Sequence, residues 1–116
     1  MTLSSPSRRN VLKGAVALAA ALSPGRILAQ QSEVHEVTIR AFKFAPKVVQ
    51  VRVGDTIRWT NKDLAPHTAT ADAFGWDTGT LEKNESQEIV VTADMEKTYF
   101  CAFHPHMKGK IEVVLG

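Results

Sequence analysis

Apolar and polar side chains alternate with a period of two along most of the chain from Val34 onward. Val37 and Ile39 share one face of such a segment, and Ile57 and Trp59 share one face of another. This alternation is typical of strands with one buried face. Four more segments have the same pattern: Val49 to Val53, Ile89 to Val91, Thr98 to Cys101, and Ile111 to Leu115. No segment after Val34 keeps a helical period for long enough to predict a helix.

Turn-forming residues separate these segments, notably Gly54-Asp55 and Asn61-Lys62-Asp63. Short strands with turns between them predict an all-β fold, a small antiparallel sandwich or barrel. We expect aromatic side chains to supply much of its core: Phe42, Phe44, Trp59, Phe100 and Phe103.

Length and charge narrow the functional classes. A chain of 116 residues has room for one small domain, which excludes a large multi-domain enzyme. Residues 1–29 hold four basic side chains and no acidic one, so the remaining residues hold 10 basic and 12 acidic side chains. A nearly neutral body gives no electrostatic basis for binding nucleic acid. Four histidines and one cysteine suffice for one metal site, which excludes a multicopper oxidase or a binuclear metalloenzyme.

The N-terminal residues have the pattern of an export signal. The basic stretch Arg8-Arg9-Asn10-Val11-Leu12-Lys13 precedes a short apolar run over residues 14–22, and Ala29 is a small residue suited to cleavage. The paired arginines favour a twin-arginine signal peptide, with an ordinary general-secretion signal as the alternative. We therefore expect a leader over residues 1–29 that is cleaved near Ala29, no membrane span, and a domain over residues 30–116 in a bacterial periplasm.

Three metal-ligating residue types fall close together near the C-terminus. Cys101, His104 and Met107 follow one another at Cys-x2-His-x2-Met spacing, so one loop between two strands could wrap them around an ion. His67, far upstream, would add a second imidazole. Two imidazoles and a thiolate with a long axial thioether form the ligand field of a blue-copper electron-transfer site. The same soft cysteine and histidine ligands would also suit a structural zinc ion.

These residues are part of a longer segment of the chain that resembles a known protein family. The segment Cys101-x-x-His104-Pro105-x-Met107-x-Gly109 resembles the C-terminal ligand loop of the amicyanins and, more broadly, of plastocyanins and pseudoazurins. The resemblance extends over residues 37–115. It includes these upstream segments: Phe42-x-Phe44-x-Pro46, Val51-x-Val53-Gly54-Asp55-Thr56-Ile57-x-Trp59-x-Asn61-x-Asp63, Pro66-His67-Thr68 and Trp76-Asp77-Thr78-Gly79.

The resemblance implies a cupredoxin, a Greek-key β-sandwich of about eight strands that binds one type 1 copper ion cycling between Cu(I) and Cu(II). It implies His67, Cys101 and His104 as equatorial ligands and Met107 as the weak axial ligand. Electrons would pass through the exposed edge of His104, inside an apolar patch with Pro66 and Pro105. The implied partners are a periplasmic dehydrogenase or cytochrome, and the protein would be a monomer. Four protein ligands leave no open metal position, so no enzymatic activity is expected.

Three positions depart from the amicyanin pattern. Thr68 stands where these proteins usually have an asparagine that ties the two ligand loops together, and Phe103 stands where amicyanins have proline. His106 is an additional histidine that could compete with His104 for the metal. His35 is expected at the surface without a role, and Asp77 as a solvated turn residue. Three alternative functions stay open at this point: copper sequestration or delivery, a structural zinc site, and a docking subunit of a dehydrogenase or oxidase.

Overall fold

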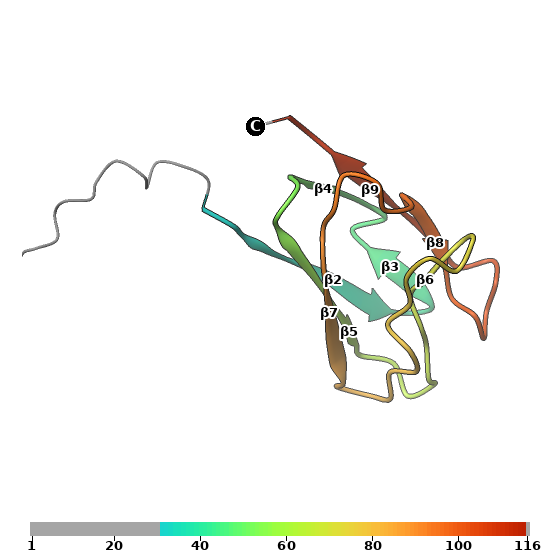
Figure 1. Cartoon of the computed structure of the whole chain (residues 1–116). Helices are drawn as coiled ribbons and strands as arrows, with labels where there is room; N and C mark the ends of the chain where they lie inside the picture. Colours follow the sequence, from blue (N-terminus) through green and yellow to red (C-terminus); the bar gives the residue numbers. More distant parts are fainter. Residues whose placement is uncertain (1–30, 116) are drawn as a thin grey trace, which may run out of the picture. The chain divides into compact units, whose positions relative to one another are not determined.

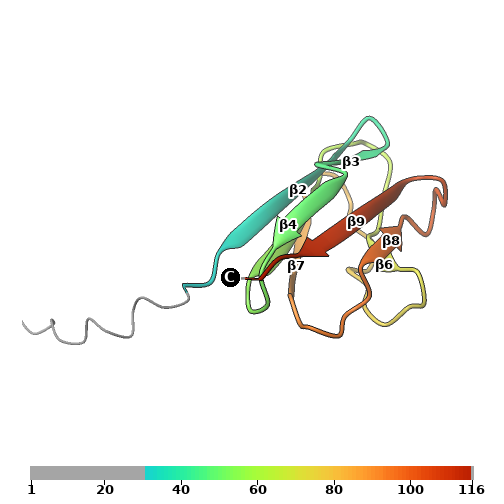
Figure 2. The ribbon, with the colours of Figure 1, turned by 90° about the horizontal axis from the view of Figure 1, so that it is seen from above.

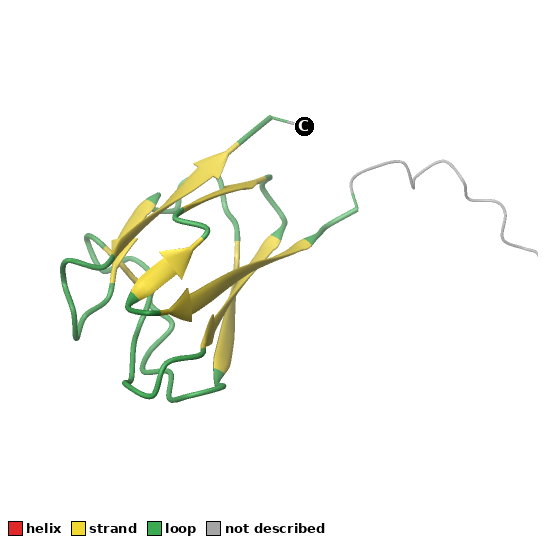
Figure 3. Cartoon of the chain, turned by 180° about the vertical axis from the view of Figure 1, so that it is seen from behind, coloured by secondary structure: helices red, strands yellow, loops and turns green. Residues whose placement is uncertain are grey.

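The computed structural model describes residues 31–115 (Figure 1). These residues form eight strands and no helix (Figure 3), which confirms the predicted all-β fold of about eight strands. Within the same range, no helix is present that could cross a bilayer. The expected leader over residues 1–29 and its cleavage near Ala29 lie outside the described residues.

The strands make two four-stranded sheets that pack face to face (Figure 2). The first sheet has the order β3-β2-β5-β7 and the second the order β4-β9-β8-β6. The strand bounds are β2 Val34–Arg40, β3 Lys43–Ala45, β4 Val48–Val51, β5 Thr56–Asn61, β6 Thr70–Ala71, β7 Ser86–Val90, β8 Thr98–Phe100 and β9 Lys108–Val113. The purely antiparallel pairing expected from the sequence is wrong in two places, because β2 pairs with β5 and β4 with β9 in parallel.

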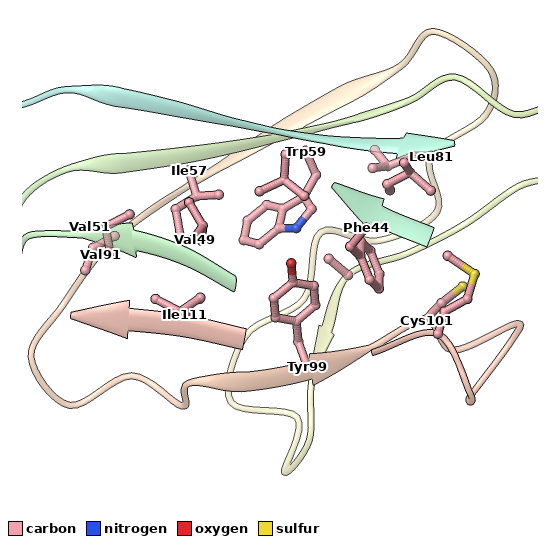
Figure 4. Packing of buried hydrophobic residues seen from close by; sticks show 14 residues of the cluster. Phe44, Val49, Val51, Ile57, Trp59, Leu81, Val91, Tyr99, Cys101 and Ile111 are labelled. Atoms are coloured by element: carbon pink, nitrogen blue, oxygen red, sulfur yellow. The ribbon is translucent and has the colours of Figure 1, made fainter. Parts of the chain in front are cut away.

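The inward-facing side chains of both sheets form one core around three aromatic rings (Figure 4). The Trp59 ring stacks on Trp76 at 5.3 Å between centroids and meets the Tyr99 ring edge-on at 5.4 Å. The Phe44 ring meets the Tyr99 ring edge-on, at 4.8 Å between centroids. Burial raises the pKa of the Tyr99 hydroxyl to about 12, so this ring stays neutral at physiological pH.

Two of the aromatic residues expected in the core are at the surface instead. Phe42 is 45% exposed and Phe103 is 51% exposed, whereas Phe44 and Trp59 are buried as expected. Phe42 lies in the turn between β2 and β3, and Phe103 lies in the loop between β8 and β9. Both are therefore beyond the ends of the strands, where strand alternation no longer determines which side chains are buried.

A buried carboxylate closes the turn before β5. The Asp55 carboxylate accepts hydrogen bonds from the backbone N–H groups of Glu33 at 3.1 Å and Arg52 at 3.0 Å, and it lies 2.8 Å from His35 Nε2. The His35 side chain is thus only 21% exposed and is bonded, unlike the free surface residue expected from the sequence. Burial raises the pKa of Asp55, but the bonds from Arg52, His35 and Glu33 outweigh it, and the net pKa lies below the ordinary 3.8.

Replacing Asp55 with asparagine is expected to lower the free energy of unfolding at pH 7 by about 1–3 kcal/mol, because buried donors lose an acceptor. The lowered pKa means that the carboxylate stabilises the fold fully above the ordinary pKa of 3.8, and that this contribution is lost as pH falls through the folded-state value. Urea unfolding at several pH values checks this. The difference between wild type and Asp55→Asn should be constant near neutral pH and shrink below about pH 4; a difference that grows in acid would contradict the assignment.

Candidate metal centre

Three potential metal donors converge at one end of the sandwich. The donor atoms of His67, Cys101 and His104 all lie within 4.8 Å of one another. Cys101 Sγ is 3.6 Å from His67 Nδ1 and 3.7 Å from His104 Nδ1. His67 and Cys101 are fully buried, and His104 is partly exposed. Figure 4 shows Cys101 at the end of the core opposite Val51 and Val91.

Two consecutive turns explain the spacing of three residues between the ligands expected in the β8–β9 loop. His104 N–H donates to the Cys101 carbonyl at 3.1 Å, and Met107 N–H donates to the His104 carbonyl at 2.8 Å. Cys101 N–H closes the loop by donating to the Met107 carbonyl at 3.1 Å. Each of these two turns spans three residues, which matches the spacing from Cys101 to His104 and from His104 to Met107. Met107 is 3% exposed and belongs to the same core cluster as Cys101.

The loop that carries His67 is held from both sides. His67 N–H donates to the Leu81 carbonyl at 3.1 Å, and Leu81 N–H donates to the His67 carbonyl at 2.8 Å. The fully buried Asn61 side chain donates to the Ala65 and Leu81 carbonyls and accepts the N–H of Asp63. All these polar groups are paired inside the protein, so the imidazole of His67 is presented by a fixed backbone.

Thr68 ties the two ligand loops together. Its backbone N–H lies 3.4 Å from Cys101 Sγ and can donate to it, and its hydroxyl oxygen accepts the Ala102 N–H at 2.8 Å. The Thr70 hydroxyl donates to the Asp77 carboxylate, which leaves the Thr68 hydroxyl to donate to Thr70 Oγ1 at 2.8 Å. The threonine thus supplies the link between the two ligand loops that the resemblance assigned to an asparagine at this position. Asp77, expected only as a solvated turn residue, supports this chain of bonds.

Two further residues contact the ligand histidines, and neither was singled out as a site residue from the sequence. Asp63 Oδ2 lies 2.9 Å from His67 Nε2, the ring nitrogen that faces away from Cys101. The Phe42 ring meets the rings of His67 and His104 edge-on, at 5.0 and 4.8 Å between centroids. Burial raises the pKa of Asp63, but N–H donors from Phe42 and Ala41, together with His67, lower it below 3.8, so this carboxylate is ionised at neutral pH.

The donor set fits a single transition-metal ion. Metal–sulfur bonds of about 2.3 Å and metal–nitrogen bonds of about 2.0–2.1 Å allow one ion to bond atoms that lie 3.6–3.7 Å apart. The soft thiolate and the two imidazoles suit copper or zinc, whereas magnesium and calcium prefer oxygen ligands. Met107, buried in the same core cluster as Cys101, offers a thioether, the donor type that favours copper in its lower oxidation state.

Comparisons with known proteins identify the family of this chain. The cupredoxin-like domain family matches residues 12–113. The chain belongs to this family. Amicyanin-alpha from Methylorubrum extorquens is 30% identical over 105 residues, which cover 81% of this chain and 86% of that protein. The amicyanin of Paracoccus denitrificans is 29% identical over 82 residues, and the match spans 66% of this chain and 63% of that protein. The crystal structure of amicyanin from Paracoccus versutus has a TM-score of 0.61 and 26% identity, over 70% of this chain and 81% of that one.

The residues expected in an apolar patch, with three further exposed or half-exposed apolar residues, lie on the two loops of the metal centre and on the β2–β3 turn. Pro105 is exposed next to His104, and Pro66 is half-buried next to His67. Phe42, Phe103 and Leu64 extend the apolar surface, and Leu64 is 84% exposed. We call these five residues the apolar rim: Phe42, Leu64, Pro66, Phe103 and Pro105.

The remaining two histidines lie outside the cupredoxin's ligand cluster. His106 is exposed, and the group of donors that the structure brings together in residues 31–115 does not include it. His35 forms a second group with Glu33 and Asp55. There the Asp55 oxygens already accept two backbone N–H groups and face the imidazole, so this group is explained by the closure of a turn.

Proposed function

We propose that this cupredoxin is a mobile electron carrier that holds one copper ion with His67, Cys101, His104 and Met107 and works in the periplasm. The observation that carries the proposal is the buried cluster in which two imidazole Nδ1 atoms face one thiol sulfur at 3.6 and 3.7 Å. Copper bound there supplies a one-electron couple between Cu(I) and Cu(II). The similarity to amicyanins supports copper as the metal.

The contribution of the protein is a site that changes little between the two oxidation states. Asn61 fixes the loop of His67, and Thr68 joins this loop to that of Cys101 by two hydrogen bonds. The Thr68 N–H also points at the thiol sulfur, and such hydrogen bonds tune the reduction potential of copper–thiolate sites. A site held rigidly by satisfied hydrogen bonds needs little rearrangement when one electron is gained or lost.

The partly exposed ring of His104 is the proposed route for electrons. Phe42 of the apolar rim contacts this ring, and Pro105 adjoins His104 in the chain. The exposed apolar side chains of the rim support brief encounters with a redox partner, a dehydrogenase or a cytochrome. With four protein ligands, the copper has no position for a substrate, which supports a carrier rather than an enzyme. The export pattern of residues 1–29 supports the periplasmic location of this encounter.

A visible spectrum tests the proposal. Purified protein given one equivalent of Cu(II) is expected to show an intense thiolate-to-copper absorption band. Ascorbate should bleach the band, and an oxidant should restore it in full through repeated cycles. A protein that loses copper on reduction would point to copper delivery instead. A colourless protein that binds zinc tightly would point to a structural zinc site.

A further inference from the structure

One carboxylate joins two separate segments of the metal-binding end. Asp63 accepts the Ala41 N–H at 2.8 Å on Oδ1 and the Phe42 N–H at 2.9 Å on Oδ2, and the same Oδ2 lies 2.9 Å from His67 Nε2. The Asp63 side chain is only 14% exposed. It therefore connects the β2–β3 turn with the loop that carries His67.

The bond to His67 determines which ring nitrogen is free. An ionised carboxylate only accepts hydrogen bonds, so His67 Nε2 must carry the proton. In a neutral imidazole the other nitrogen, Nδ1, then has a free lone pair, and this is the atom that faces Cys101. Carboxylates that bond a ligand histidine in this way orient the ring and make it a stronger donor.

The bonds to the turn hold a strained conformation. Ala41 and Phe42 both have positive φ angles, 54° and 58°, which cost non-glycine residues about 1–2 kcal/mol each. The two Asp63 oxygens bond the N–H groups of these two residues. The conformation brings the half-exposed Phe42 ring edge-on against His67 and His104. Strain kept next to a functional site indicates that the position of this ring matters there.

We propose that Asp63 is a positioning residue of the metal centre: its carboxylate holds His67 with Nδ1 free toward Cys101 and fixes Phe42 against both ligand imidazoles. The expected effects on copper binding rest on the proposed function, whereas the contact between Asp63 and His67 does not depend on it. A negative charge bonded to a ligand stabilises Cu(II) more than Cu(I). Loss of the charge should therefore weaken Cu(II) binding more than Cu(I) binding.

Asp55 provides a matched control. Asp55 also bonds two backbone N–H groups and a histidine ring, but it precedes β5, whereas Asp63 follows this strand. Its carbonyl accepts the Val91 N–H, and Val91 lies at the end of the core opposite Cys101 (Figure 4). Asp55→Asn thus removes a carboxylate with the same kinds of hydrogen-bond partners, but far from the metal.

The experiment compares the Cu(II) affinity, the reduction potential and the unfolding midpoint of wild type, Asp63→Asn, Asp63→Glu and Asp55→Asn. In Asp63→Asn, Cu(II) affinity should fall about 10–100-fold. If Cu(I) affinity falls tenfold less, the reduction potential rises by about 59 mV, the one-electron equivalent of a tenfold ratio. Asp55→Asn should lower the unfolding midpoint but leave affinity and potential unchanged, and Asp63→Glu should recover part of the Cu(II) affinity.

A separate NMR measurement needs no metal and no variant. ¹⁵N NMR of the histidine rings in the metal-free wild-type protein should show His67 protonated at Nε2. An Nδ1-protonated ring would overturn the inference even if every Asp63 variant failed to fold. An Asp63→Asn protein that is less stable but has wild-type affinity and potential would also overturn it, since Asp63 would then only close a turn. If the wild type binds no copper, the proposed function fails while the NMR result still decides the role of Asp63.

Discussion

Cys101→Ser is expected to abolish the intense visible band of the copper-loaded protein and to lower its Cu(II) affinity by more than 100-fold. The band requires a thiolate bonded to copper, and a hydroxyl cannot supply it at neutral pH. Changes to residues that merely support ligands already lower metal affinity about 10–100-fold, so the loss of a direct ligand should exceed this range. Absorption spectra and competition with a chelator of known affinity measure the two effects.

The matched control for this variant is His106→Ala. His106 lies in the same loop but is exposed and outside the donor cluster, so its loss should leave the colour and affinity unchanged. The Cys101→Ser protein should still fold without metal, because the serine hydroxyl can accept the Thr68 N–H, which points at the Cys101 sulfur in the wild type. A Cys101→Ser protein that folds and keeps the band would exclude the thiolate as a ligand.

The sequence pattern was sufficient to predict the all-β fold and the buried faces of its strands. Strand alternation placed Val37, Ile39, Ile57 and Trp59 in the core, where all four are buried. The spacing from Cys101 to Met107 is local, and two turns within the loop explain it. Short-range information of this kind is present in the order of residues, because strand pleat and turn length fix the direction of successive side chains.

The supports of the site could not be predicted in the same way. The bonds of Asp63 to Ala41 and Phe42 join residues 22 and 21 positions apart, and the bond of Thr68 to Ala102 spans 34. Such contacts depend on which loops meet at one end of the two sheets, and strand alternation does not encode this. For the same reason Phe42 was expected in the core, although its turn places the ring half-exposed between the ligand imidazoles and solvent.

Removing copper is expected to lower the unfolding midpoint by roughly 15–30 °C. A ligand that binds only the folded state at 1,000 times its dissociation constant stabilises that state by about 4 kcal/mol. For domains of about 60–100 residues, each kcal/mol shifts the midpoint by roughly 4–8 °C. Copper should bind only the folded state because His67 and Cys101, which are 34 residues apart in the chain, lie in two different loops. An unfolded chain does not hold His67 beside Cys101.

Thermal unfolding with and without copper, followed by the fluorescence of the stacked Trp59 and Trp76, measures this shift. The Asp55→Asn protein should have a lower unfolding midpoint without copper and the same increase in midpoint when copper binds. The reason is that Asp55 and the metal lie at opposite ends of the core. Cys101→Ser should gain little. Zinc is expected to stabilise the wild type without producing colour, which separates metal binding from redox function. Equal midpoints with and without bound copper would mean that the metal is not held by residues that only folding brings together.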